Sequence, residues 1–273
     1  MAAIRSSLAS GNLAGAQTAS DRLMGLEPTN FEGYFWRGFV ELQRENGYDA
    51  VRFLRRAEAL DANPYVLKLL AVAYYTLRQF HLFTLEMNEA MQSQPEDYAP
   101  YYYLGRYYVS DEVTDWDKAA DYFKRATERN PKYFPSYYYL GYCYEVRGRW
   151  AEAERQYRQA IQLADATSSK FALPYEGLAR LRLLENRAAD ALPFAQRAVE
   201  LAPNDAEGHE ALAKAYADMG RRAEAVPEWE RAAVLNPTDA SPYYHLYQIY
   251  MASGQKEKAT FAYAKFKKLS ALY

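Results

Sequence analysis

The side chains best suited to catalysis or metal binding are widely dispersed in this sequence. Its three histidines, His81, His209 and His245, are far from the three- or four-residue spacing that places two metal ligands on one helix face. The acidic stretch 111–117 lacks the alternating Asp or Asn and the glycine of a calcium-binding loop. The sequence has neither a glycine-rich phosphate loop nor a nucleophile elbow. We therefore expect no catalytic residue, no metal, no cofactor and no enzyme activity.

Cysteine and tyrosine usage favours packing and contact surfaces over reactive chemistry. The single cysteine, Cys143, excludes an internal disulfide. It lies in an aromatic, helix-like stretch, where we expect a small buried hydrophobic side chain rather than a reactive thiol. Tyrosine is frequent, with 27 copies. Because tyrosine combines a large apolar ring with one polar tip, it suits interfaces that stay partly wet.

Charge and hydropathy argue against two classes of protein. The 273-residue chain has 33 basic and 35 acidic residues and a formal net charge of −2, whereas a nucleic-acid binder normally shows a basic excess. The longest apolar run, Leu69 to Leu77, is about nine residues, far short of a membrane span. The first ten residues contain no secretory signal. We expect a soluble protein, cytoplasmic by default, or periplasmic or secreted if a leader has been removed.

Several segments repeat one pattern of large and small residues. Residues 137–144 read Tyr-Tyr-Tyr-Leu-Gly-Tyr-Cys-Tyr, and Ala153, Tyr157 and Ala160 follow at the spacing of a second helix. Similar runs begin at Tyr101, His209 and Tyr243. A fixed period of this length predicts a repeat architecture rather than one globular core.

Each recurring position has a physical reason. Positions 4, 7, 8 and 11 of a unit fall on one face of a helix, so their side chains pack on the partner helix, and a small residue at position 8 allows close approach. Glycines that suit a left-handed helix cap follow three of the first helices, at Gly148, Gly220 and Gly254. Prolines that cannot continue a helix follow the second helices, at Pro95, Pro131, Pro203 and Pro237.

This pattern resembles the tetratricopeptide repeat, whose period is about 34 residues. The resemblance covers nearly the whole chain, because several of the positions recur together in at least four units. It implies an all-α fold, a right-handed α-solenoid of stacked antiparallel helix pairs. It also implies a protein or peptide partner bound on the first helices of the repeats.

We expect a single array over residues 1–273, because each repeat buries its faces only against its neighbours. A partial repeat at 1–30 is followed by units at 31–64, 65–97, 98–133, 134–171, 172–205, 206–239 and 240–273. Phe83 replaces the small residue expected at position 20 of its unit, which puts that helix crossing in doubt. Insertions at 110–115 and 166–171 break the period, and the second is the expected flexible point.

Positions 2, 5, 9 and 12 of the first helices form a stripe roughly 130° from the packing face, and the family resemblance places ligands there. The aromatic residues of the stripe concentrate in the first four full units, and a mixed-charge section lies between Glu176 and Lys214. The expected groove residues are Phe35, Phe39, Tyr75, Tyr102, Arg106, Tyr138, Tyr142, Arg180 and Tyr244. Alternatively, these tyrosines pack against the adjacent repeat.

The expected function is that of a non-catalytic scaffold or adaptor that binds a protein or peptide in this aromatic groove. Binding of acidic chaperone tails is not expected, because Val72 and Tyr103 stand where that clamp has asparagines. The alternative is a self-assembling module, or a fragment of a longer array, that forms homo-oligomers through its ends. It rests on the last predicted helix, 256–273, whose apolar residues have no polar capping helix after them. They are Phe261, Phe266, Leu269, Leu272 and Tyr273.

Overall fold

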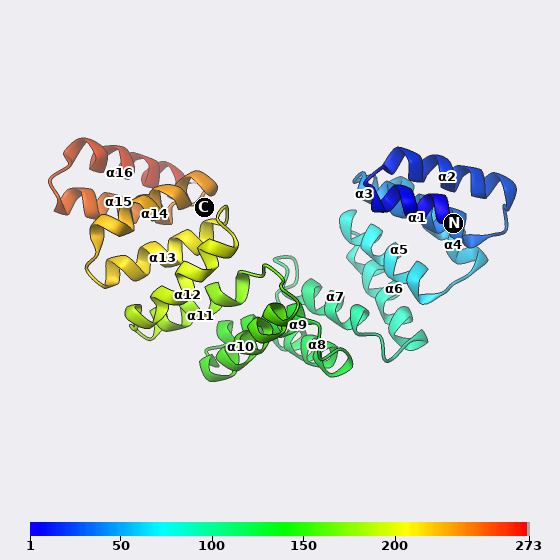
Figure 1. Ribbon diagram of the computed structural model, residues 1–273, viewed down its shortest axis with the longest axis horizontal. Helices are drawn as coiled ribbons and strands as arrows, with labels where there is room; N and C mark the ends of the chain where they lie inside the picture. Colours follow the sequence, from blue (N-terminus) through cyan, green and yellow to red (C-terminus); the bar gives the residue numbers. More distant parts are fainter. Residues whose placement is uncertain (272–273) are drawn as a thin grey trace. The chain divides into compact units, whose positions relative to one another are not determined.

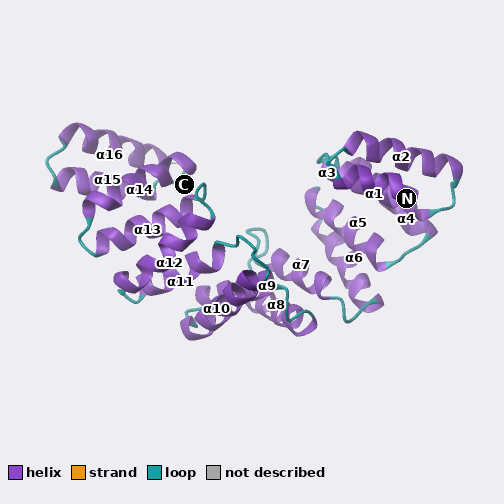
Figure 2. Cartoon of the chain, in the orientation of Figure 1, coloured by secondary structure: helices purple, strands orange, loops and turns teal. Residues whose placement is uncertain are grey.

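The computed structural model describes residues 1–271, which form sixteen helices and no strand (Figures 1 and 2). The chain consists of two compact units, residues 1–131 and 132–273. The first unit holds α1 (Ala2–Ala9), α2 (Leu13–Leu26), α3 (Phe31–Gln43), α4 (Gly47–Leu60), α5 (Pro64–Thr76), α6 (Phe80–Ser93), α7 (Tyr98–Tyr108) and α8 (Trp116–Arg129). The second holds α9 (Phe134–Val146), α10 (Trp150–Ala166), α11 (Leu173–Leu184), α12 (Ala188–Leu201), α13 (Ala206–Asp218), α14 (Arg222–Leu235), α15 (Ser241–Ala252) and α16 (Lys256–Ser270).

Within each unit, every odd-numbered helix packs against the even-numbered helix that follows it, and each pair packs on the next. This arrangement confirms the predicted all-α fold of stacked helix pairs. That all the repeats form one continuous array over 1–273 stays a prediction. None of the described helices has the length and apolar character needed to cross a bilayer.

Local sequence sets the ends of the helices. Asparagine or aspartate at the N-cap accepts a hydrogen bond from a backbone N–H of the first turn, which satisfies one otherwise unpaired donor. These caps are Asn12, Asn30, Asn46, Asn63, Asp97, Asp115 and Asp205. The four prolines expected to follow second helices each lie two residues beyond the end of one. The helix boundaries therefore follow from short-range chemistry.

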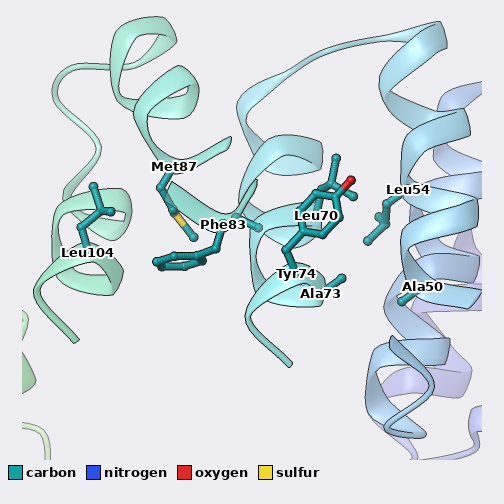
Figure 3. Close-up of a cluster of buried hydrophobic side chains, with 9 residues drawn as sticks. Ala50, Leu54, Leu70, Ala73, Tyr74, Phe83, Met87 and Leu104 are labelled. Atoms are coloured by element: carbon teal, nitrogen blue, oxygen red, sulfur yellow. The ribbon is translucent and has the colours of Figure 1, made fainter. Parts of the chain in front are cut away.

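The core of the first unit lies between its helix pairs. Phe83 of α6 is buried there among Leu70, Met87 and Leu104 (Figure 3). Its size put the α5–α6 crossing in doubt, yet the two helices pack as the other pairs do. The buried cluster also contains Ala71 and Ala73 of α5. The ring is therefore accommodated within this buried cluster and does not keep the two helices from packing.

The turn after the first helix of a pair needs a left-handed residue. Glycine supplies it at Gly148, Gly220 and Gly254, with φ of 71°, 78° and 73°. At the equivalent turn after α3, Glu45 adopts φ 61°. A side chain with a Cβ is strained in this conformation by about 1–2 kcal/mol, whereas glycine is not.

Replacing the exposed Glu45 with glycine is expected to raise the free energy of unfolding by about 0.5–1 kcal/mol, because relief of strain exceeds the extra chain entropy of glycine. The reverse change, Gly220→Ala, is expected to lower it by about 1 kcal/mol. A Cβ at Gly220 meets no atom within 4 Å, so only the backbone contributes. Thermal unfolding followed by circular dichroism measures both. A lower midpoint for Glu45→Gly would contradict the strain argument.

Candidate functional site

A groove of about 810 Å³ lies in the second unit, along the first helices of three successive pairs, α9, α11 and α13. Tyr138, Tyr142 and Glu145 come from α9, while Glu176 and Arg180 come from α11. The remaining polar lining is Glu207, Glu210 and Lys214 of α13, with Asn236 and Asp239 after α14. Because these residues recur at three- and four-residue spacing, each helix presents one polar and aromatic edge to the groove.

Beneath the groove, the ring of Tyr157 on α10 is held between two glycines. A Cβ added to Gly141 of α9 would lie 2.8 Å from this ring, and one added to Gly177 of α11 would lie 2.5 Å from it. Contacts this short do not occur between real atoms, so the ring occupies the space of two missing side chains. Tyr157 therefore sets the spacing of α9 and α11.

The Tyr157 hydroxyl organises an ion pair at the groove. Its Oη donates a hydrogen bond of 2.5 Å to Glu145 Oε2. Arg180 donates to both oxygens of the same carboxylate, through Nε to Oε1 and through Nη2 to Oε2 at 3.0 Å. Burial disfavours the charge on Arg180, but the hydrogen bonds and charge of Glu145 outweigh it, so the pKa of Arg180 is raised. Such two-pronged pairing fixes the guanidinium plane.

Tyrosines of α9 form the aromatic side of the groove. The rings of Tyr138 and Tyr142 are stacked, 6.4 Å apart and 15° from parallel. Tyr138 is buried and contacts the edge of Phe171 at 5.6 Å, and burial raises the pKa of its hydroxyl. Tyr142 is half-buried, with the Arg180 guanidinium 5.9 Å from its ring centre. Of the two, Tyr142 has the surface that a ligand can touch.

Glu176 is a buried carboxyl group in the groove lining. Its exposed fraction is 2%, and its Oε1 has no hydrogen-bond partner in the structure described here. Burial, together with repulsion from Asp205 and Glu207, raises the pKa of Glu176 to about 8, against the opposing effect of Arg180. At neutral pH this carboxyl is therefore mostly protonated and uncharged.

Of the nine residues expected to form a groove, the structure brings Tyr138, Tyr142 and Arg180 together in this one. Tyr244 lies elsewhere in the same unit, on α15, with its ring 5.1 Å from that of Phe266. The acidic groove residues Glu145, Glu176, Glu207 and Glu210 were not among the nine. Their signal was available, since they occupy the same stripe positions as the tyrosines.

The other five expected residues belong to the first unit. Phe39 lines a separate groove of about 550 Å³ with Trp36, and Phe35 packs on Trp36 at 5.0 Å. Tyr75 contacts Phe83 at 5.3 Å. Tyr102 is buried 5.9 Å from Phe123, and Arg106 Nη1 donates to its hydroxyl at 3.3 Å. Their role in partner binding stays a prediction.

His209, His245 and Cys143 have packing roles, whereas His81 is exposed on α6. His209 is buried, with Nδ1 2.6 Å from Glu228 Oε2 and Nε2 3.1 Å from the Pro203 carbonyl oxygen. His245 is stacked on Trp229 at 4.6 Å, and burial lowers its pKa. Cys143 is buried, and burial raises the pKa of its thiol to about 12, so the thiol is protonated at neutral pH. Among residues 1–271, no three His, Cys, Asp or Glu side chains are grouped to hold a metal ion.

Comparison with known sequences identifies one kind of repeat. Residues 111–169 match the family model of the tetratricopeptide repeat. The chain is 22% identical over 207 residues to the protein CTR9 homolog of Arabidopsis thaliana. The match covers 76% of this chain but only 16% of that protein. The relative is therefore much longer than the region it shares with this chain.

Several solved structures share the fold, and two of the three described next are named as tetratricopeptide-repeat proteins. A chain of the APC/C hetero-tetramer Cut9–Hcn1 is similar with a TM-score of 0.73 and 16% identity, over 87% of this chain and 48% of that one. A tetratricopeptide-repeat protein from Parabacteroides merdae is similar with a TM-score of 0.64 and 17% identity. The match covers 91% of this chain and 96% of that one. YrrB, a tetratricopeptide-repeat protein described as having an unusual peptide-binding site, is similar with a TM-score of 0.52 and 23% identity. The match covers 67% of this chain and 91% of YrrB. The fold is thus that of a helical-repeat solenoid.

The buried Glu176 is expected to make stability depend on pH. Its pKa is raised from 4.5 in the unfolded chain to about 8 in the folded one, so the folded state binds this proton more tightly. Stability present below pH 4.5 is therefore lost as pH rises toward 8. Relative to Glu176→Gln, wild type should lose about 1–3 kcal/mol between pH 5 and pH 8. Parallel pH profiles of the unfolding midpoint for the two proteins would contradict this assignment.

Proposed function

We propose that this chain is a tetratricopeptide-repeat protein that acts as a non-catalytic interaction scaffold and binds a polypeptide segment in the groove of its second unit. The observation that carries the proposal is the line of aromatic and polar side chains from α9, α11 and α13 along one open groove. A surface that spans three repeats suits an extended chain better than a compact small molecule. The peptide-binding site described for YrrB supports the same class of ligand.

The groove combines the features that binding requires. Tyr142 offers a half-buried ring, and the Glu145–Arg180 pair holds that edge of α11 in place. Rigid aromatic surface beside fixed polar groups binds a ligand at low entropic cost. Glu145 and Arg180 are already engaged with Tyr157 and with each other, and Glu210 accepts a hydrogen bond from Ser241. Such mutual pairing favours recognition over proton transfer.

Tyr142→Ala is expected to weaken partner binding by about tenfold or more, because a central aromatic side chain carries a large share of an interface's binding energy. The chain is used as bait in a lysate of its source organism, beside the variant and beside Tyr48→Ala. Tyr48 is 76% exposed on α4, outside the groove, and provides the matched control. Circular dichroism checks that all three are folded. Partners retained equally by Tyr142→Ala and wild type would contradict the groove as the binding surface.

A second surface supports self-association, which we propose as an additional function. A groove of about 570 Å³ lies among α14, α15 and α16, and its lining is mainly apolar. Val234 and Phe261 line this groove, and their exposed fractions are 67% and 62%. Leu272 and Tyr273, which also suggested an apolar end, lie outside the described residues. We infer that a second copy of this chain covers the groove, since exposed apolar surface of this kind favours association.

Phe261→Glu is expected to shift the chain toward the monomer, because a carboxylate in an apolar contact must lose its hydration. Sedimentation equilibrium over a range of concentrations measures the shift, with an expected weakening of about tenfold or more. Leu85→Glu, at an exposed leucine of α6, serves as the control. A wild-type chain that stays monomeric at every concentration would rule out this self-association.

A further inference from the structure

The groove of the second unit carries an excess of acidic groups. Five carboxyl side chains line it against two cationic ones, Arg180 and Lys214. The carboxyls are Glu145, Glu176, Glu207, Glu210 and Asp239. Arg180 pairs with Glu145, and its Nη1 also lies 3.8 Å from Glu207 Oε2, while Lys214 Nζ lies 3.5 Å from Asp218 Oδ2. Even with Glu176 mostly uncharged at neutral pH, the other four carboxyls outnumber the two cations, so the groove has a negative potential that would attract a cation.

Glu176 adds a second and independent observation. Its side chain is almost completely buried, yet it lines the groove and its Oε1 accepts no hydrogen bond from the described residues. An unpaired buried carboxyl oxygen is costly, and a donor that reaches it from the groove would remove that cost. The structure thus contains a prepared acceptor whose donor does not come from the part of the chain described.

We propose that this groove recognises a lysine or arginine side chain of its polypeptide ligand, with the Glu176 carboxyl group as the acceptor. The inference rests on the proposed function and adds the chemical class of the ligand. A cationic donor forms a charge-assisted hydrogen bond with Glu176, which is stronger than a neutral one. The ring of Tyr142 offers packing for the aliphatic part of the side chain or for the cation itself.

The charges around Glu176 favour a cation over an anion. Asp205 and Glu207 face it from the start of α13, and Arg180 faces it from one turn along α11. Tyr138 of α9 is also within electrostatic range. An acidic ligand would add to the repulsion from Asp205 and Glu207, whereas a basic one relieves it. Glu207, whose side chain is 71% exposed, extends the acidic surface outward for the rest of a basic segment.

The test is a selection of random twelve-residue peptides, displayed on phage, against the full chain. Enrichment of lysine and arginine in the selected peptides is expected. Synthetic copies of these peptides are then titrated calorimetrically into wild type, Glu176→Gln and Glu128→Gln, an exposed control on α8. Loss of a charge-assisted hydrogen bond predicts binding about tenfold to a hundredfold weaker for Glu176→Gln alone. Glu210→Gln provides a second groove variant if Glu176→Gln does not fold.

Dependence on pH gives a further readout. Between pH 6.5 and 8.5 the Glu176 carboxyl loses its proton, so affinity for an arginine-containing peptide should rise in wild type. The pKa of Glu210 is also raised, mainly by burial, so part of the rise can come from Glu210. The part of the rise in affinity that is absent from Glu176→Gln is due to Glu176. An affinity that does not change with pH in wild type would overturn the role of Glu176.

The outcomes separate this inference from the proposed function. If the selected peptides lose binding to Tyr142→Ala but contain no excess of lysine or arginine, the groove remains the binding surface. The proposed recognition of a basic side chain would then be wrong. Enrichment of acidic residues would also overturn it. Peptides that bind Tyr142→Ala as tightly as wild type would contradict the groove as the binding surface, and so would a selection that yields no peptide. Either result would also overturn the recognition of a basic side chain.

Discussion

The second unit depends on one close contact, the ring of Tyr157 held between Gly141 and Gly177. The ring fixes the spacing of α9 and α11, and its hydroxyl positions the Glu145 carboxylate. That carboxylate in turn holds Arg180 by two hydrogen bonds. Close packing of the Tyr157 ring in the core therefore fixes the positions of the Glu145 and Arg180 charges at the groove. Neither glycine can gain a side chain without moving the helix that carries part of the groove.

This coupling separates two kinds of polar group in the groove. The Glu145 and Arg180 side chains satisfy one another and behave as structural parts of the wall. Glu176 is different, because it is buried beside acidic neighbours and one oxygen has no partner in the described structure. A natural protein tolerates such a group mainly where function offsets its cost to stability. Within the groove, this unpaired oxygen is the atom to which a hydrogen-bond donor from a ligand would contribute most.

Much of the fold was predictable from the sequence because its determinants are local and repeated. The period placed the helix pairs, asparagine and aspartate caps set where many helices begin, and Pro95 or Gly148 follow positions where helices end. Phe83 shows the limit of this reasoning. Its size conflicts with the repeat pattern, and only the structure shows that the surrounding buried cluster accommodates the ring while α5 and α6 still pack. Volume is shared between helices, so one position does not determine the packing.

The sequence alone therefore determined the helical repeat, the stripe from which the groove residues come and the absence of any familiar catalytic motif. Tertiary structure decided which stripe residues a ligand can reach. Tyr138 and Tyr142 are one helical turn apart, yet Tyr138 is buried against Phe171 from the loop after α10 while Tyr142 is half-exposed. The pKa of Glu176 likewise depends on Asp205 and Glu207 at the N-terminal end of α13. Burial and charge are properties of neighbours in space, which the periodicity of a single helix does not encode.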